Sequence, residues 1–303
     1  MNTFLNLIGR KSELFDADIK INEKKIREII ESSKFIVIGG AGSIGSAVVK
    51  EVFKRNPKKL HIIDINENNL TELVRDIRSS HSSSNSDLKT FAIDVGSVEF
   101  KLFMKYKKYD YVLNLSALKH VRSEKDPYTL HRMTVVNIFN PLKILKLCRH
   151  SGLKKYFCVS TDKASDPANM MGASKRIMEL VLFSEKKNVP ISMARFANVY
   201  FSDGSLLHGF QQRFFKNQPL SSPSDISRFF ITAKEAAELC ILSCILGKNR
   251  EIYFPKKINK IKLIKFSEIA ISFLKNHNYE AVIFNSEKRA IIRNKLLIKN
   301  KKW

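Results

Sequence analysis

The sequence has few acidic residues and few cysteines, and it has no long apolar run. Its 303 residues include 29 Asp and Glu against 53 Lys and Arg, and only four cysteines. The cysteines have no spacing typical of zinc or redox sites, which predicts buried thiols in a reducing cytoplasm. No apolar run is long enough to cross a membrane, and the first ten residues lack the pattern of a signal peptide. We therefore expect a cytoplasmic protein without a transmembrane segment.

Metal-ligand clusters and internal repeats are also missing. The seven histidines are dispersed, and none lies at ligand spacing from a cysteine or carboxylate, so we expect no bound metal. The net charge of +24 comes from lysines scattered along the whole chain, without a nucleic-acid-binding motif. We interpret this charge as a compositional bias, and we expect no nucleic-acid partner.

Strand-like and helical segments alternate over most of the chain, with 44% hydrophobic residues. This pattern predicts an α/β fold, a Rossmann-like doubly wound parallel sheet with a smaller C-terminal substrate-binding subdomain. We expect a helical extension at 1–33, a dinucleotide-binding domain at 34–200, and a substrate-binding subdomain with a basic tail at 201–303. Within that tail, residues 285–303 show only a weak helical stripe.

A glycine motif follows the first expected strand and opens a helix. Gly39, Gly42 and Gly45 are spaced G-x-x-G-x-x-G, and the turn also contains Ser43 and Ile44. Such glycines allow a tight turn, a close approach to a pyrophosphate and close packing of helix on strand. The next strand ends in Asp64, 19 residues beyond Gly45, where a carboxylate binds the ribose hydroxyls of NAD and repels a 2′-phosphate. The motif predicts a dinucleotide site, with NAD as cofactor and NADP possible.

Polar residues follow the next expected strands as well. The candidates for further cofactor contacts are Asp94, Val95, Ser116 and Asn137. Lys119 and His120 follow the fourth strand, where they would hold a phosphate or sugar; the alternative is an ordinary basic loop.

The stretch around which the chain is organised is Ser160-Thr161-Asp162-Lys163. It follows a buried strand at 155–159, and a helix is expected over 173–186. Met171 and Lys175 are four residues apart, so they share one face of that helix. Reactive side chains at the carboxyl end of a strand predict a ligand site, although a polar loop with a helix cap fits the local sequence too.

Taken together, these motifs resemble those of the extended short-chain dehydrogenase/reductases, and among them the nucleotide-sugar 4,6-dehydratases of polysaccharide biosynthesis. The resemblance covers about residues 34–260. It depends on the glycine turn, on the stretch from Ser116 to Val121 with Glu124 and Pro127, on the segment from Ser160 to Lys175, and on the segments that begin at Arg195 and Arg228.

The resemblance implies a catalytic group of Thr161, Asp162, Lys163 and Lys175. Lys163 would be the base at C5 of the sugar, Asp162 the acid at O6, and Thr161 the partner of the 4-hydroxyl, while Lys175 would hold the nicotinamide ribose. UDP-N-acetylglucosamine is the implied substrate. Its implied contacts are Lys119, His120, Met171, Asn198, Ser205 and Arg228. We also expect a homo-oligomer.

Met171 stands where the superfamily has a tyrosine, and a thioether cannot take a proton. Two alternatives therefore stay open: a 4- or 5-epimerase on the same substrate, and an inactive paralogue that binds NAD and nucleotide sugar as a scaffold. The chain also ends earlier than we expect of soluble relatives, which would weaken a substrate lid.

Overall fold

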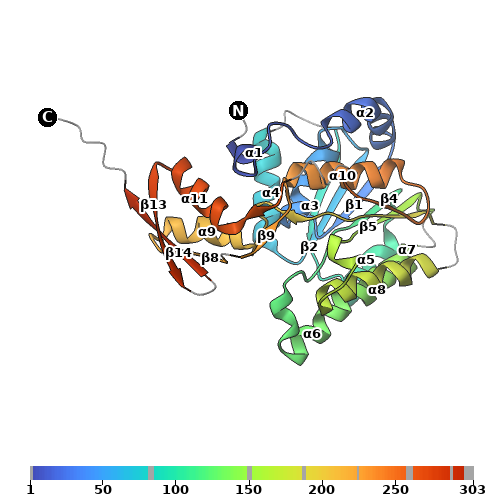
Figure 1. Cartoon of the computed structure of the whole chain (residues 1–303). Helices are drawn as coiled ribbons and strands as arrows, with labels where there is room; N and C mark the ends of the chain where they lie inside the picture. The colour runs from blue at the N-terminus through green and yellow to red at the C-terminus, as the bar shows by residue number, and fades with distance from the viewer. Residues whose placement is uncertain are drawn as a thin grey trace. The chain divides into compact units, whose positions relative to one another are not determined.

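The computed structural model describes residues 3–80, 85–148, 152–185, 189–223, 225–256, 262–286 and 289–296. The chain divides into two compact units. The sheet unit comprises Phe15–Phe196 and Ala233–Pro255, and the small unit comprises Met1–Leu14, Ala197–Thr232 and Lys256–Trp303. Figure 1 shows the elements of both units.

The sheet unit is built on seven parallel strands in the order β11-β6-β5-β4-β1-β2-β3. These are β1 (Lys34–Ile38), β2 (Lys59–Asp64), β3 (Asp87–Ala92), β4 (Tyr111–Asn114), β5 (Lys155–Val159), β6 (Ile191–Ala194) and β11 (Glu251–Tyr253). Strand β1 lies between β4 and β2, and Phe35 lies opposite both Leu60 of β2 and Tyr111 of β4. The predicted Rossmann-like doubly wound sheet is confirmed.

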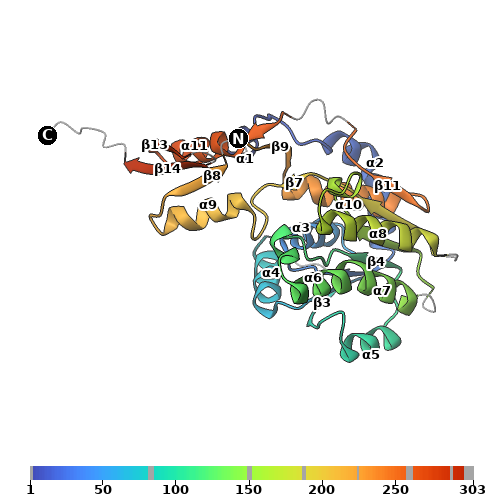
Figure 2. The ribbon, with the colours of Figure 1, turned by 60° about the horizontal axis from the view of Figure 1, so that its bottom comes forward.

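Helices cover both faces of this sheet (Figure 1). One face carries α2 (Asp16–Glu31), α3 (Ser43–Phe53) and α10 (Ala233–Leu246), which pack against one another. The other face carries α5 (Val98–Tyr106), α7 (Asn140–Cys148) and α8 (Met170–Ser184) (Figure 2). The remaining helices are α4 (Glu67–Ser80) and α6 (Pro127–Thr134), with short turns at Val121–Glu124 and Asp162–Ala164 and a π-helical segment at Val135–Phe139.

Burial on both faces explains why the central strands read as continuous apolar runs. Four residues of β1, from Phe35 to Ile38, are fully buried. A large core lies between the sheet and the helices α5, α7 and α8, and it includes Phe100, Ile144 and Met178. Because the seven strands run parallel, their carboxyl ends share one edge of the sheet.

The described part of the small unit combines several two-residue strands and a longer hairpin with three helices. Its helices are α1 (Thr3–Leu7), α9 (Leu206–Phe215) and α11 (Phe266–Asn276). Its strands are β7 (Asn198–Val199), β8 (Leu220–Pro223), β9 (Ser227–Arg228), β10 (Phe230–Ile231), β12 (Ile264–Lys265), β13 (Tyr279–Ser286) and β14 (Arg289–Leu296). Strands β13, β14 and β8 form an antiparallel sheet, on which α11 packs. A separate apolar core includes Leu5, Phe210 and Phe273.

Three features differ from the sequence-based expectations. Helix α10 and strand β11 belong to the sheet unit, because β11 pairs in parallel with β6 and α10 packs on α3. Residues 1–33 do not form one extension, since α1 packs in the small unit while α2 packs against α10. The described part of 285–303 forms strand rather than helix, because pairing with β13 and β8 overrides a weak helical pattern. Across the described ranges, no helix combines the length and apolar character that spanning a membrane requires.

A buried carboxylate lies between α10 and the helices it covers. Glu238 is almost completely buried, and its Oε2 atom has no hydrogen-bond partner among the described residues. Its Oε1 atom lies 3.4 Å from Nζ of Lys234. Burial, together with the nearby carboxylates of Glu51 and Asp16, raises the pKa of Glu238 to about 7, although Lys234 opposes the shift. The folded protein therefore retains a proton that the unfolded chain releases near pH 4.5.

The raised pKa predicts how stability depends on pH. Because the folded state binds this proton more tightly, the contribution of Glu238 is fully favourable below pH 4.5 and is lost as the pH rises through about 7. Glu238→Gln should therefore stabilise the protein at pH 8 by about 1–3 kcal/mol and change little at pH 4.5. Thermal unfolding at both pH values measures this, with the exposed Glu72→Gln as control. A variant that gains no stability at pH 8 would show that the fold does not raise the pKa of Glu238.

Candidate functional site

The glycine turn lies where β1 ends beside β4. Gly39 has φ of +72°, which favours glycine, and a Cβ atom there would lie 2.6 Å from the backbone nitrogen of Ser116. A Cβ on Gly45 would lie 2.0 Å from the carbonyl oxygen of Gly39, so the start of α3 packs directly on the turn. Strands β2 and β4 flank β1 on opposite sides, and the direction of the connections changes there. Such a switch point is where open α/β sheets bind ligands.

Asp64 fastens the glycine turn to the end of β2. Its Oδ2 atom accepts a hydrogen bond from the backbone nitrogen of Ala41 at 2.9 Å, and its Oδ1 atom accepts one from Asn66 at 3.0 Å. The side chain is only partly buried. The carboxylate therefore helps to shape the turn while it also faces the adjacent cavity.

A cavity of about 270 Å³ opens at this switch point. Six of the residues predicted to bind a cofactor line it: Gly39, Gly42, Asp64, Asp94, Val95 and Ser116. Further lining residues that the sequence reasoning missed are Ile63, Ile65, Ile93, Leu115, Ala117, Leu118, Arg132, Val136 and Asn140. Arg132 comes from α6 and lies 3.8 Å from the carboxylate of Asp94. Nothing in the local sequence marks it, because its place depends on how α6 folds back over the strand ends.

The other predicted cofactor residues have different surroundings. Ser43, Ile44 and Gly45 form the first turn of α3 and do not line the described cavity. Asn137 is fully buried in the π-helical segment. Its Oδ1 atom accepts from the backbone nitrogen of Leu118, and its Nδ2 atom donates to the carbonyl of Leu118, both at 2.9 Å. Nδ2 also donates to Oγ of Ser174 at 3.0 Å. It holds the loop after β4 against α8.

Thr161, Asp162 and Lys163 follow β5 as one hydrogen-bonded group. The hydroxyl of Thr161 donates to Oδ1 of Asp162 at 2.9 Å, and Nζ of Lys163 lies 3.0 Å from the same oxygen. The backbone nitrogen of Asp162 donates to the carbonyl of Phe196, just beyond β6. The three side chains are part-exposed, so they can reach a ligand.

Helix α8 begins directly behind this group. Asn169 caps the helix by accepting from the backbone nitrogen of Gly172 at 2.9 Å, and Glu124 accepts from that of Met170 at 2.7 Å. A Cβ on Gly172 would lie 2.7 Å from the carbonyl oxygen of Lys163, so this glycine allows the close approach. The start of α8 is therefore positioned by Glu124 and residues 169–172, which belong to the motifs that carry the family resemblance.

The two predicted site residues of α8 are both buried. Lys175 donates from Nζ to the carbonyl of Val159 at 3.1 Å, at the end of β5. Burial lowers the pKa of Lys175, while the thiol of Cys158 and the carboxylate of Glu179 act in the opposite direction. Met171 is surrounded by protein and has only a thioether to offer, which suits it for packing.

Glu179 is the centre of a polar cluster beside the site. This buried carboxylate accepts from Oγ of Ser160 at 2.6 Å and from Nε of Arg195 at 2.7 Å. Arg176 adds a more exposed contact at 3.3 Å. The pKa of Arg195 is raised, first by its hydrogen bond to Glu179. The cluster thus ties the ends of β5 and β6 to α8, and it occupies Arg195, which begins one of the segments on which the family resemblance depends.

The predicted substrate residues divide between the two units. Lys119 and His120 are exposed on the loop after β4. The pKa of His120 is lowered, first by the partial burial of its ring and then by the charge of Lys119. In the small unit, Asn198 donates from Nδ2 to the carbonyl of Phe229 at 3.3 Å, and Ser205 caps α9 by accepting from the nitrogen of His208 at 3.1 Å. Arg228 is exposed on β9. Their contacts with a ligand stay predictions.

Residues 35–290 match a family described as "Polysaccharide biosynthesis protein". The chain is 31% identical to the "Uncharacterized membrane protein MJ1061" of Methanocaldococcus jannaschii, over 82% of this chain and 74% of the relative. It is 25% identical to a UDP-N-acetylglucosamine 4,6-dehydratase (inverting) of Campylobacter jejuni, over 84% and 75%. It is 26% identical to the probable polysaccharide biosynthesis protein EpsC of Bacillus subtilis over 87% of this chain, but it spans less than half of that relative, 43%.

Solved structures share the fold. Pen from Bacillus thuringiensis superposes with a TM-score of 0.72 at 21% identity, covering 89% of both chains. The Bordetella bronchiseptica enzyme WbmF, solved in complex with NAD+, superposes with a TM-score of 0.66 at 19% identity, covering 83% of this chain and 81% of WbmF.

The cluster around Glu179 predicts a graded response to mutation. Glu179→Ala leaves Arg195 and Ser160 without their partner next to the core, and such a loss typically costs about 3–5 kcal/mol. Arg176→Ala removes an exposed contact of the same carboxylate and should cost less than about 1 kcal/mol. Denaturant unfolding of the two variants measures the difference. Equal losses would mean that the cluster does not hold the strand ends together.

Proposed function

From the premise that the chain belongs to the polysaccharide biosynthesis protein family, in the nucleotide-sugar dehydratase branch of the extended short-chain dehydrogenase/reductases, we propose a 4,6-dehydratase function. The proposed substrate is a UDP-N-acetylhexosamine, with UDP-N-acetylglucosamine as the first candidate. The observation that carries the proposal is the hydrogen-bonded group of Thr161, Asp162 and Lys163 at the end of β5. It combines a base, an acid and a hydroxyl, the three groups that dehydration needs.

The cavity at the switch point fits a nicotinamide dinucleotide. The turn at Gly39 and Gly42 has no side chain that would block a pyrophosphate, and the start of α3 supplies backbone N–H groups. The carboxylate of Asp64 would bind the adenosine ribose, and Lys175 the nicotinamide ribose. When bound there, the nicotinamide would supply a hydride acceptor for C4 of the sugar and a hydride donor for C6.

The proposed chemistry of this group is a proton relay. Thr161 donates its own hydrogen to Asp162 and accepts a 3.4 Å hydrogen bond from the backbone nitrogen of Lys163, which leaves one lone pair to accept a hydrogen bond from the sugar's 4-hydroxyl. The Asp162 carboxylate takes that proton through Thr161 and later delivers it to the 6-hydroxyl, which leaves as water. The amine of Lys163 removes the C5 proton that the new C4 ketone has made acidic, and it protonates C5 again at the end. The product is a 4-keto-6-deoxy sugar nucleotide.

This relay assigns no proton transfer to Met171. Its buried thioether would pack beside the sugar and nicotinamide, in the position where a tyrosine would otherwise act as base. The Thr161–Asp162 hydrogen bond offers the 4-hydroxyl proton another route.

Mass spectrometry of the sugar nucleotide tests this proposal. Incubation with UDP-N-acetylglucosamine and NAD+ should give a product lighter by one water, and Lys163→Ala should slow its formation by about 10²–10⁴-fold while still binding the substrate. The matched control is Lys154→Ala, a half-exposed lysine at the opposite end of β5. A product of unchanged mass and altered stereochemistry at C4 would make the protein an epimerase. Binding of both ligands without conversion would make it a scaffold.

The contacts of Asp64 predict NAD rather than NADP as the cofactor. Asp64→Asn keeps an oxygen that can accept from Ala41 but removes the negative charge. It should weaken NAD+ binding by roughly 10-fold or more and bring the two affinities closer together. Titration calorimetry measures both, with Asp18→Asn, which removes an exposed carboxylate of α2 outside the cavity, as the control for charge. Tighter binding of NADP+ than of NAD+ by the unaltered protein would contradict the assignment.

A further inference from the structure

One face of the helical stretch after β4 lines the cavity at the switch point. Arg132 of α6, Val136 of the π-helical segment and Asn140 of α7 follow one another at four-residue spacing, and all three line the cavity. In a straight α-helix, residues at this spacing drift around the axis by about 40° at each step, and the wider π turn between them reduces that drift. The cavity therefore has a helical wall, and Arg132 brings the charge to it.

The backbone of Arg132 is fixed, whereas its guanidinium is open to the cavity. Met133, the next residue, is fully buried, and the backbone nitrogen of Val135 donates to the carbonyl of Arg132. The side chain of Arg132 is 56% exposed, and its contact with Oδ2 of Asp94, at 3.8 Å, is longer than a hydrogen bond. Within the described ranges, no hydrogen bond holds the guanidinium, so it can turn toward a ligand.

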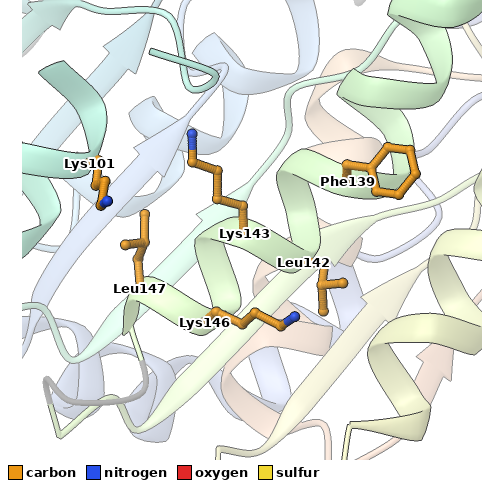
Figure 3. A pocket seen from close by; sticks show the side chains of 6 residues that line it. All are labelled: Lys101, Phe139, Leu142, Lys143, Lys146 and Leu147. Carbon is orange, nitrogen blue, oxygen red and sulfur yellow. The ribbon is translucent and has the colours of Figure 1, made fainter. Parts of the chain in front are cut away.

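Asp94, just beyond β3, is held in place by the turn that follows it. Its Oδ1 atom accepts from the backbone nitrogen of Gly96 at 2.8 Å, and the carbonyl of Gly96 accepts from Nζ of Lys143 at 3.0 Å. Lys143 lines a different hollow, a groove of about 350 Å³ between α5 and α7 (Figure 3), so it supports the turn without lining the cavity itself. The Oδ2 atom of Asp94, which faces Arg132, is left to accept from a ligand.

The rest of the cavity lining suits a flat ring better than a phosphate beside Arg132. Aliphatic side chains line it from the ends of β2 and β3 and the positions just beyond them: Ile63, Ile65, Ile93 and Val95. The carboxylates of Asp64 and Asp94 belong to the same lining, and their negative charge would repel a phosphate. The glycine turn and the start of α3 already offer backbone N–H groups to a pyrophosphate.

We propose that Arg132 binds the adenine half of the cofactor by packing the plane of its guanidinium on the face of the base. The inference rests on the proposed dinucleotide site and deepens it by naming the residue that covers the adenine. A guanidinium packs on aromatic rings through cation–π and stacking contacts, whereas the ammonium group of a lysine lacks the plane. Asp94, with its fixed carboxylate, would accept from the 6-amino group and keep the guanidinium close by.

Titration calorimetry with the two halves of the cofactor tests this proposal on the full-length protein. AMP and nicotinamide mononucleotide each carry one ribose phosphate but different bases. Arg132→Ala should weaken the binding of NAD+ and of AMP by about 5- to 30-fold and leave that of nicotinamide mononucleotide unchanged. Arg132→Lys should lose nearly as much, because lysine keeps the charge without the plane. The control, Arg78→Ala, removes an exposed arginine of α4 that does not line the cavity.

Failure of this inference differs from failure of the proposed function. Unchanged affinity of Arg132→Ala for NAD+ would overturn the inference alone, provided that the unaltered protein binds NAD+. Recovery of affinity in Arg132→Lys, or an equal loss with nicotinamide mononucleotide, would overturn it in favour of a phosphate contact. An unaltered protein that binds neither NAD+ nor AMP would overturn both the inference and the proposed cofactor site.

Discussion

The carboxylate of Glu179 joins three segments that lie apart along the chain. It accepts hydrogen bonds from Ser160 at the end of β5 and from Arg195 at the end of β6, and it belongs to α8. A buried carboxylate is costly unless all of its lone pairs are used, and here charge-assisted donors use them. The position of Thr161, Asp162 and Lys163 depends on this cluster, since they begin one residue after Ser160. The same helix carries Lys175, so one contact positions both parts of the proposed catalytic group.

The cofactor side of the site depends on a second constraint, which is steric. Gly39 approaches the backbone at Ser116, and Gly45 approaches the carbonyl of Gly39, at distances that no side chain tolerates. Asp64 then holds the turn through Ala41. The residue proposed to select NAD is therefore also a structural part of the turn that would bind the pyrophosphate. The affinity for the cofactor and the shape of the turn are coupled through this one carboxylate.

The many positively charged side chains have different surroundings in different parts of the fold. Several cations are used inside the fold: Arg195 pairs with Glu179, and the buried Arg55 pairs with Glu23 and Glu51. Others, such as Lys20 and Lys24, lie on a helix whose acidic residues balance them. In α5 and α7 the lysines have few acidic neighbours along the helix and lie among exposed apolar side chains.

The sequence by itself determined the parallel sheet, the glycine turn with Asp64, and the reactive stretch after β5. These features are encoded locally: a buried strand reads as a continuous apolar run, and only glycine meets the φ and the close approaches that the turn requires. Only the tertiary structure decided that Arg132 lines the cavity, that Asn137 holds a loop and that Arg195 pairs with Glu179. It also decided that β11 completes the sheet and that residues 289–296 form a strand. Each of these depends on pairing between segments distant in sequence, where long-range contacts outweigh local propensity.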